Sequence, residues 1–154
     1  MAIENQDIIK ETIIISRTCN SIASSLSSLL EKELEDGDIT FEIFISSHNN
    51  IITPLLRQSA SIVFKTSEQI SSELLKHFTA ISDATNSLKA ELVKIQKAQK
   101  VIEVAAGFLT TVALIATFVA APAVASGVAA LASLTGLIKS MQTDVKLEEG
   151  DGQE

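Results

Sequence analysis

Apolar residues recur along the start of the chain at spacings of three, four and seven, which is the repeat of one helix face. This stripe consists of Ile8, Ile15, Cys19, Ile22, Leu26 and Leu29. The β-branched run at residues 13–15 is also compatible with a strand, but the stripe continues on both sides of it and favours a helix. Asp36-Gly37-Asp38 then predicts a helix stop and a turn. We therefore expect a first helix over about Asn5–Glu35.

The segment after Gly37 allows two interpretations. Residues 39–45 alternate loosely and include two phenylalanines, which is compatible with a short strand. Helical spacing continues through Phe41, Ile45 and Ile52, so we interpret this segment as the start of a second helical element. Pro54 either opens a new helix with Thr53 as its cap or kinks a continuous one.

No strong helix breaker occurs from Leu55 to Ile102. An apolar stripe runs through this segment at near-heptad spacing: Ile62, Thr66, Ile70, Leu74, His77, Ile81, Ala84, Leu88, Leu92, Ile95 and Ile102. The pattern predicts one helix of about 70 Å, whose stripe needs a partner along its length.

A stretch of 35 residues without a charged side chain, Val104–Ile138, follows. About 20 helical residues cross the hydrocarbon core of a bilayer, so this stretch is too long for one span. Pro122 divides it into two short helices, which predicts a hairpin with both ends on the same side. The chain thus divides into an amphipathic region (1–103), the apolar hairpin (104–138) and an acidic tail (139–154).

The two halves of this stretch differ in composition. The first half and the bend carry the residues that we expect to insert into a membrane: Phe108, Leu109, Val112, Leu114, Ile115, Phe118, Val119 and Pro122. The second half is rich in small residues at spacings of four, which let helices approach closely in lipid. Its expected helix-packing residues are Ser126, Gly127, Ala130, Ser133 and Gly136. The alternative is that both halves form the core of a soluble bundle, since a core helix is also apolar all round.

Lysines precede the apolar stretch. Lys94, Lys97 and Lys100 are either a solvated helix face or a cluster that contacts anionic lipid headgroups. The chain as a whole has a net charge of −7, which argues against nucleic acid as a partner. It contains no Trp or Tyr, the residues that commonly anchor permanent spans at the headgroup level.

No pattern in the sequence indicates catalysis, a metal or a cofactor. His48 and His77 fit no metal-ligand spacing, and phosphate-binding loops, nucleophile elbows and CxxC pairs are absent. His77 and Cys19 lie on apolar stripes, so we expect a core histidine and a buried inert thiol. Serines at positions 21, 24, 25, 27 and 28 are expected to solvate the first helix, and residues 148–154 to form a frayed end.

Residues Leu88–Lys139, in which a long amphipathic helix leads into an apolar hairpin, resemble the α-helical pore-forming proteins of the cytolysin A-like type. In that family the hairpin is hidden in a soluble form and inserts on oligomerisation. There the hairpin lies between two long helices, whereas here residues 139–154 follow it. The resemblance rests on the overall pattern and carries no individual functional residue across.

The sequence therefore predicts an all-α protein that is not an enzyme. We expect it to contact a lipid membrane, to form homo-oligomers or bind a helical partner, and to permeabilise a bilayer through its hairpin. We expect no small-molecule substrate. The alternatives are a small integral membrane protein with a coiled-coil stalk and a soluble helical adaptor. The N-terminus is acidic and lacks the regions of a secretory signal, so we expect a cytoplasmic protein or one released without a signal.

Overall fold

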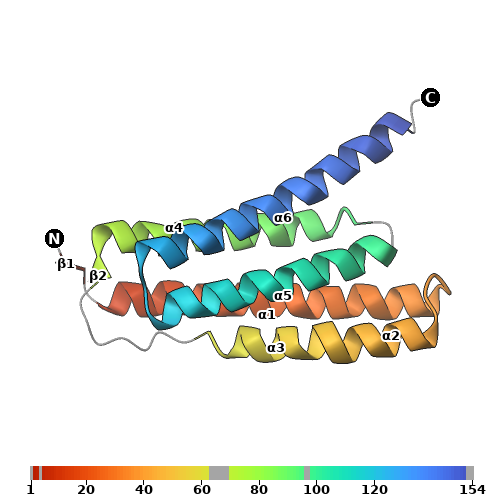
Figure 1. The fold of residues 1–154 in the computed structure, drawn as a ribbon, viewed down its shortest axis with the longest axis horizontal. Coiled ribbons are helices and arrows are strands. Elements are labelled where there is room, and N and C mark those ends of the chain that lie inside the picture. Colours follow the sequence, from red (N-terminus) through yellow and green to blue (C-terminus); the bar gives the residue numbers. More distant parts are fainter. Residues whose placement is uncertain (1, 4, 63–69, 96–97, 152–154) are drawn as a thin grey trace.

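Long amphipathic helices build the fold, as the apolar spacing predicts. The computed structural model describes residues 2–3, 5–62, 70–95 and 98–151. Its helices lie side by side as a bundle, and the last helix extends beyond the others (Figure 1). Two short strands, β1 (Ala2–Ile3) and β2 (Ile70–Ser71), pair antiparallel, with Ala2 opposite Ser71.

Helix α1 (Asn5–Glu35) has the predicted bounds. Its stripe from Ile8 to Leu26 is fully buried, so the periodicity correctly identified the core face. Gly37 ends the helix in a left-handed conformation with φ of +78°, which glycine adopts without strain. The amide of Asp38 donates to the carbonyl of Glu33 (2.9 Å) and the amide of Gly37 to that of Leu34 (3.1 Å), the Schellman arrangement.

After the turn, an arm of residues 41–60 runs back along α1. It consists of α2 (Phe41–Ser47), the π-helical turn η1 (His48–Ile52) and α3 (Thr53–Ala60), so the helical interpretation of residues 39–45 is confirmed from Phe41 onward. The Thr40 hydroxyl caps α2 by accepting from the amide of Ile43 (3.2 Å). Thr53 is not a cap: its amide donates to the carbonyl of His48 within the π-turn. The wide turn lets the helix continue into Pro54, whose ring would clash with a regular preceding turn.

The prediction of one helix from Leu55 to Ile102 is wrong. Helix α3 ends at Ala60, and α4 (Ser72–Leu92) and α5 (Ala98–Ala120) are separate helices. Ser71 opens α4 by accepting a hydrogen bond from the amide of Leu74 (3.2 Å). Neither the segment between α3 and α4 nor the segment between α4 and α5 contains Gly or Pro. Breaking the helix lets its pieces pack against one another, so that Ile81, Leu88 and Ile115 share one core.

The last two helices form the predicted hairpin. Helices α5 and α6 (Val124–Asp151) run in opposite directions on either side of the turn at Pro122 (Figure 1). Their bounds do not follow the composition: α5 begins six residues before the uncharged stretch, and α6 continues thirteen residues beyond it. The frayed tail that the sequence predicts is therefore wrong as far as Asp151, because the backbone is helical there.

Helix α5 occupies the middle of the bundle. It packs against α6 and also against α1 and the arm. Helix α6 packs on α4 and α5 and lies at the edge of the bundle in Figure 1. The two halves of the hairpin are therefore in different surroundings, since α5 is a central helix and α6 an outer one.

Candidate membrane-contact hairpin and a neighbouring groove

Helix α5 turns its bulky side into the core. Phe108, Val112, Ile115, Phe118 and Val119, all expected to insert, are fully buried among the other helices. The remaining residues of that set are partly buried: Leu109, Leu114 and Pro122. The outward face of α5 carries small side chains instead, namely Ala106, Thr110, Ala113 and Thr117. In this state no bulky residue of the set is fully exposed, so lipid contact by α5 requires the bundle to open.

Helix α6 is apolar and yet largely exposed. Within its apolar span only 22% of the residues are buried, against 44% in the span of α5. Val124 and Val128 are 45% and 52% exposed, and Ala125, Ala129 and Ala132 are exposed as well. By length and composition, Ala98–Ala120 and Val124–Gln142 each suffice to cross a membrane, a property that core helices of soluble proteins share. The exposure of α6 distinguishes it from such a core helix.

Four hydroxyl groups in the hairpin find their partners inside the hairpin. The Thr111 and Ser133 hydroxyls lie 2.6 Å apart, and the Thr111 hydroxyl also donates to the carbonyl of Gly107 (3.0 Å). Thr117 and Ser126 donate to the carbonyls of Ala113 (2.9 Å) and Ala123 (3.1 Å). These four hydroxyls therefore need no partner from the rest of the bundle.

The expected helix-packing residues fall into two groups. At Gly127 an added Cβ would lie 3.1 Å from the rings of His77 on α4 and Phe118 on α5, so three helices meet there. Ala130 is fully buried, and Ser133 bonds to α5. Ser126 bonds only to its own helix end, and the position of Gly136 opens onto empty space. The first half of α6 thus approaches both α4 and α5 at Gly127, and farther along, α6 still approaches α5, since a Cβ added at Gly107 would lie 3.0 Å from Leu137.

The lysines before the hairpin have polar partners in the bundle. Lys94 is paired with Glu91 (3.1 Å). Lys100 is paired with Glu103 (3.7 Å) and donates to the hydroxyl of Ser140 on α6 (3.3 Å). Lys97 lies outside the described residues. Lys100 therefore joins the two ends of the hairpin.

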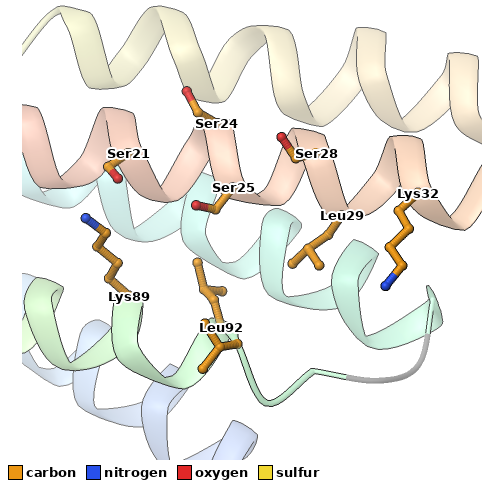
Figure 2. A pocket seen from close by; sticks show the side chains of 9 residues that line it. Ser21, Ser24, Ser25, Ser28, Leu29, Lys32, Lys89 and Leu92 are labelled. Atoms are coloured by element: carbon orange, nitrogen blue, oxygen red, sulfur yellow. The ribbon is translucent and has the colours of Figure 1, made fainter.

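A groove between α1 and the end of α4 is the site that the sequence did not predict. It has a volume of about 500 Å³, and we call it the serine groove. Its lining consists of four serines, two lysines and three apolar residues: Ser21, Ser24, Ser25, Ser28, Lys32, Lys89, Leu29, Leu92 and Val93. Figure 2 shows Lys89 extending from α4 toward Ser21 on α1, with Lys32 at the other end. The only sequence signal for this groove is a set of small residues at helical spacing. A solvated helix face has the same pattern.

The titratable side chains that the structure describes are spread over several helices. In the described ranges, no three His, Cys, Asp or Glu residues come together as metal ligands. Cys19 is fully buried, and this burial raises the pKa of its thiol to about 12. His48 stacks on Phe44, and the partly buried His77 meets the edge of Phe118, so both rings have packing roles.

The last turn of α1 holds one buried carboxylate. Glu33 is 8% exposed, and its Oε2 has no hydrogen-bond partner among the described residues. Burial raises the pKa of Glu33, and the neighbouring carboxyls of Asp38 and Asp36 add to this effect, which Lys32 only partly offsets. This turn is therefore a local source of instability at neutral pH.

Comparison with known proteins finds no match: no family model, no curated protein and no solved structure is similar to the chain. The function is therefore argued from the hairpin and the groove alone.

Proposed function

We propose that the chain is a membrane-active helical protein that permeabilises a lipid bilayer by inserting the α5–α6 hairpin. The folded bundle is its water-soluble form, and copies of the chain associate when the hairpin inserts. Soluble chains are cytoplasmic or released from the cell, and active chains are bound to a membrane. Lys94 and Lys100 lie beside the base of the hairpin, where they can contact anionic headgroups.

The observation that carries this proposal is the exposed apolar face of α6. A soluble helix at the edge of a bundle normally places charged and polar residues on its outer side. The uncharged part of α6 instead exposes Val124, Val128 and three alanines to water. A contiguous apolar surface of this kind is typical of a membrane or protein contact.

The internal bonding of the hairpin supports insertion as a unit. A bilayer offers no hydrogen-bond partners, so only segments whose polar groups are satisfied internally can cross it. The backbone of each helix meets this condition, and the hydroxyls of Thr111, Thr117, Ser126 and Ser133 meet it as well. The hairpin can therefore leave the bundle without leaving these groups unpaired.

The buried side of α5 explains why the hairpin stays folded in water. Its five fully buried large side chains contribute about 1.5–3 kcal/mol each, which amounts to about 7–15 kcal/mol. That is comparable with the whole stability of a typical domain. Opening in water therefore unfolds the bundle, whereas lipid accepts the same side chains at little cost.

A matched pair of substitutions tests insertion. Thr110 and Thr79 are exposed threonines in helix interiors, the first near the middle of α5 and the second on α4 outside the hairpin. Because both are exposed, Thr110→Asp and Thr79→Asp are each expected to keep the melting temperature within a few degrees of the parent's. A charge at the centre of a span costs about 2.5–3.5 kcal/mol, or about 60- to 300-fold.

The measurement is dye release from anionic and neutral vesicles, together with thermal melting in water. We expect Thr110→Asp to lose release by about two orders of magnitude while Thr79→Asp keeps it. Equal release by both variants, or no release by the parent on either vesicle, would refute the proposal.

The buried face of α5 favours a second candidate, a soluble helical adaptor. In that case the hairpin is permanent core, and the exposed face of α6 contacts a protein. This candidate predicts no release from any vesicle and unchanged folding of both aspartate variants, so the same experiment separates the two functions.

A further inference from the structure

The serine groove and the far end of α6 are complementary in charge and size. The groove carries Lys32 and Lys89 at its two ends, both exposed, and neither makes an ion pair among the described residues. From Gln142 to Asp151, α6 contains four acidic residues and one lysine, namely Asp144, Glu148, Glu149, Asp151 and Lys146. The groove lining carries its two lysines and no acidic residue, while the carboxyl of Glu33, outside the lining, interacts with Lys32.

The groove has the dimensions of a helix-docking site. From Ser21 to Lys32 it follows about 16 Å of α1. The part of α6 from Gln142 to Asp151 has a length of about 15 Å at the same rise. Serine side chains are short, so they let a second helix approach α1 closely. The partly buried Leu29 and the 85%-exposed Val93 give the groove an apolar wall.

The end of α6 lies too far from the groove of its own chain to fill it. Helix α6 extends past the bundle, and its last turns lie away from the other helices (Figure 1). In Figure 2, α4 separates the groove from α6. The fitting occupant is therefore α6 of another copy.

We propose that the acidic end of α6 from one copy docks into the serine groove of the next. The contact is head-to-tail, because groove and helix end are different surfaces of the chain. Such contacts repeat and close into rings or continue as filaments. This contact is the mode of assembly of the membrane-active form. It rests on the proposed function only because that function requires the chain to assemble.

Charge reversal in water tests this contact without lipid. The groove variant is Lys32→Glu with Lys89→Glu, and the tail variant is Glu148→Lys with Glu149→Lys. The control is Lys10→Glu with Lys76→Glu, two exposed lysines of the same two helices outside the groove. Each Lys→Glu substitution lowers the net charge by two, so the groove variant and the control have the same net charge. Sedimentation velocity over a concentration series at low salt measures association, and circular dichroism checks folding.

We expect the parent and the control to associate and both reversed variants to do so about tenfold more weakly. Mixing the two reversed variants should restore association, because each groove then meets a tail of opposite charge. High salt should weaken the parent's association by screening. A monomeric parent, a groove variant that associates like the parent, or a mixture that stays dissociated would each overturn the proposal.

Vesicles separate this inference from the proposed function. A parent that associates as described but releases no dye would refute membrane permeabilisation and leave the docking contact standing. If the parent is monomeric and the groove variant loses binding to anionic vesicles, the groove takes a lipid headgroup, and the docking contact is refuted.

Discussion

The two glycines of α6 that were expected to pack helices should respond in opposite ways to the same substitution. An alanine at Gly127 places its Cβ 3.1 Å from ring atoms of His77 and Phe118. An alanine at Gly136 meets nothing within 4 Å. Both positions lie in one helix, so the pair isolates packing from helix propensity.

The magnitudes follow from two opposing effects. Alanine is more favourable than glycine in a helix by about 0.8–1 kcal/mol, and Gly136→Ala should gain about that amount. At Gly127 the partly buried His77 can move, but Phe118 is fully buried against Phe78, with 4.7 Å between ring centroids. Overpacking of this kind costs about 1–3 kcal/mol, so after the gain in helix propensity Gly127→Ala should lose between about 0 and 2 kcal/mol net.

Thermal and urea melting of the two variants measure the difference. For a chain of this length, 1 kcal/mol corresponds to about 2–4 °C. Gly136→Ala should therefore melt about 2–4 °C higher than the parent, and Gly127→Ala should melt between about 0 and 8 °C lower. In the background of Phe118→Leu, which removes the ring edge, the loss at Gly127 should shrink. Equal stabilisation by both alanines would refute the close approach of α6 to α4 and α5.

Two further predictions concern the titratable groups of α1. Glu33→Gln should raise the melting temperature at about pH 8, because the folded state raises the pKa of Glu33 above its ordinary value of 4.5 and ionisation above that pKa costs stability. The gain should vanish below pH 4.5, where the parent carboxyl is protonated in both the folded and the unfolded chain; a gain independent of pH would contradict the raised pKa. Burial raises the pKa of the Cys19 thiol to about 12, so a thiol reagent at about pH 8 should react slowly with the native chain and rapidly in denaturant. Rapid reaction of the folded chain would show that Cys19 is accessible.

The sequence correctly predicted the helices whose ends are set by local signals, namely α1 and the hairpin. The bounds of α1 follow from its continuous stripe and from Gly37, which supplies the left-handed residue of the turn. The hairpin follows from Pro122 in an uncharged stretch. These features act within a few residues of the chain, so periodicity and turn chemistry are sufficient to find them.

Other boundaries depend on packing and had no such signal. Residues 61–71 and 93–97 contain neither Gly nor Pro. A single helix there satisfies local propensity but leaves its apolar stripe without a partner, so tertiary packing decides against it. The serine groove arises in the same way, because Ser21, Ser25 and Ser28 become its wall only when the end of α4 lies beside α1.

The π-turn in the arm gives the bundle an uneven resistance to local opening. Before the turn, α2 buries only Ser47 and exposes Phe41 by 65%; after it, α3 buries Leu55 and Ser59. Backbone amides of α2 should therefore exchange with solvent well before those of α1. Ile52 of the π-turn and Val101 of α5 border one small gap, so fraying of α2 and the π-turn removes cover from the start of α5. The central helix of the bundle can thus begin to lose its cover at the edge opposite α6.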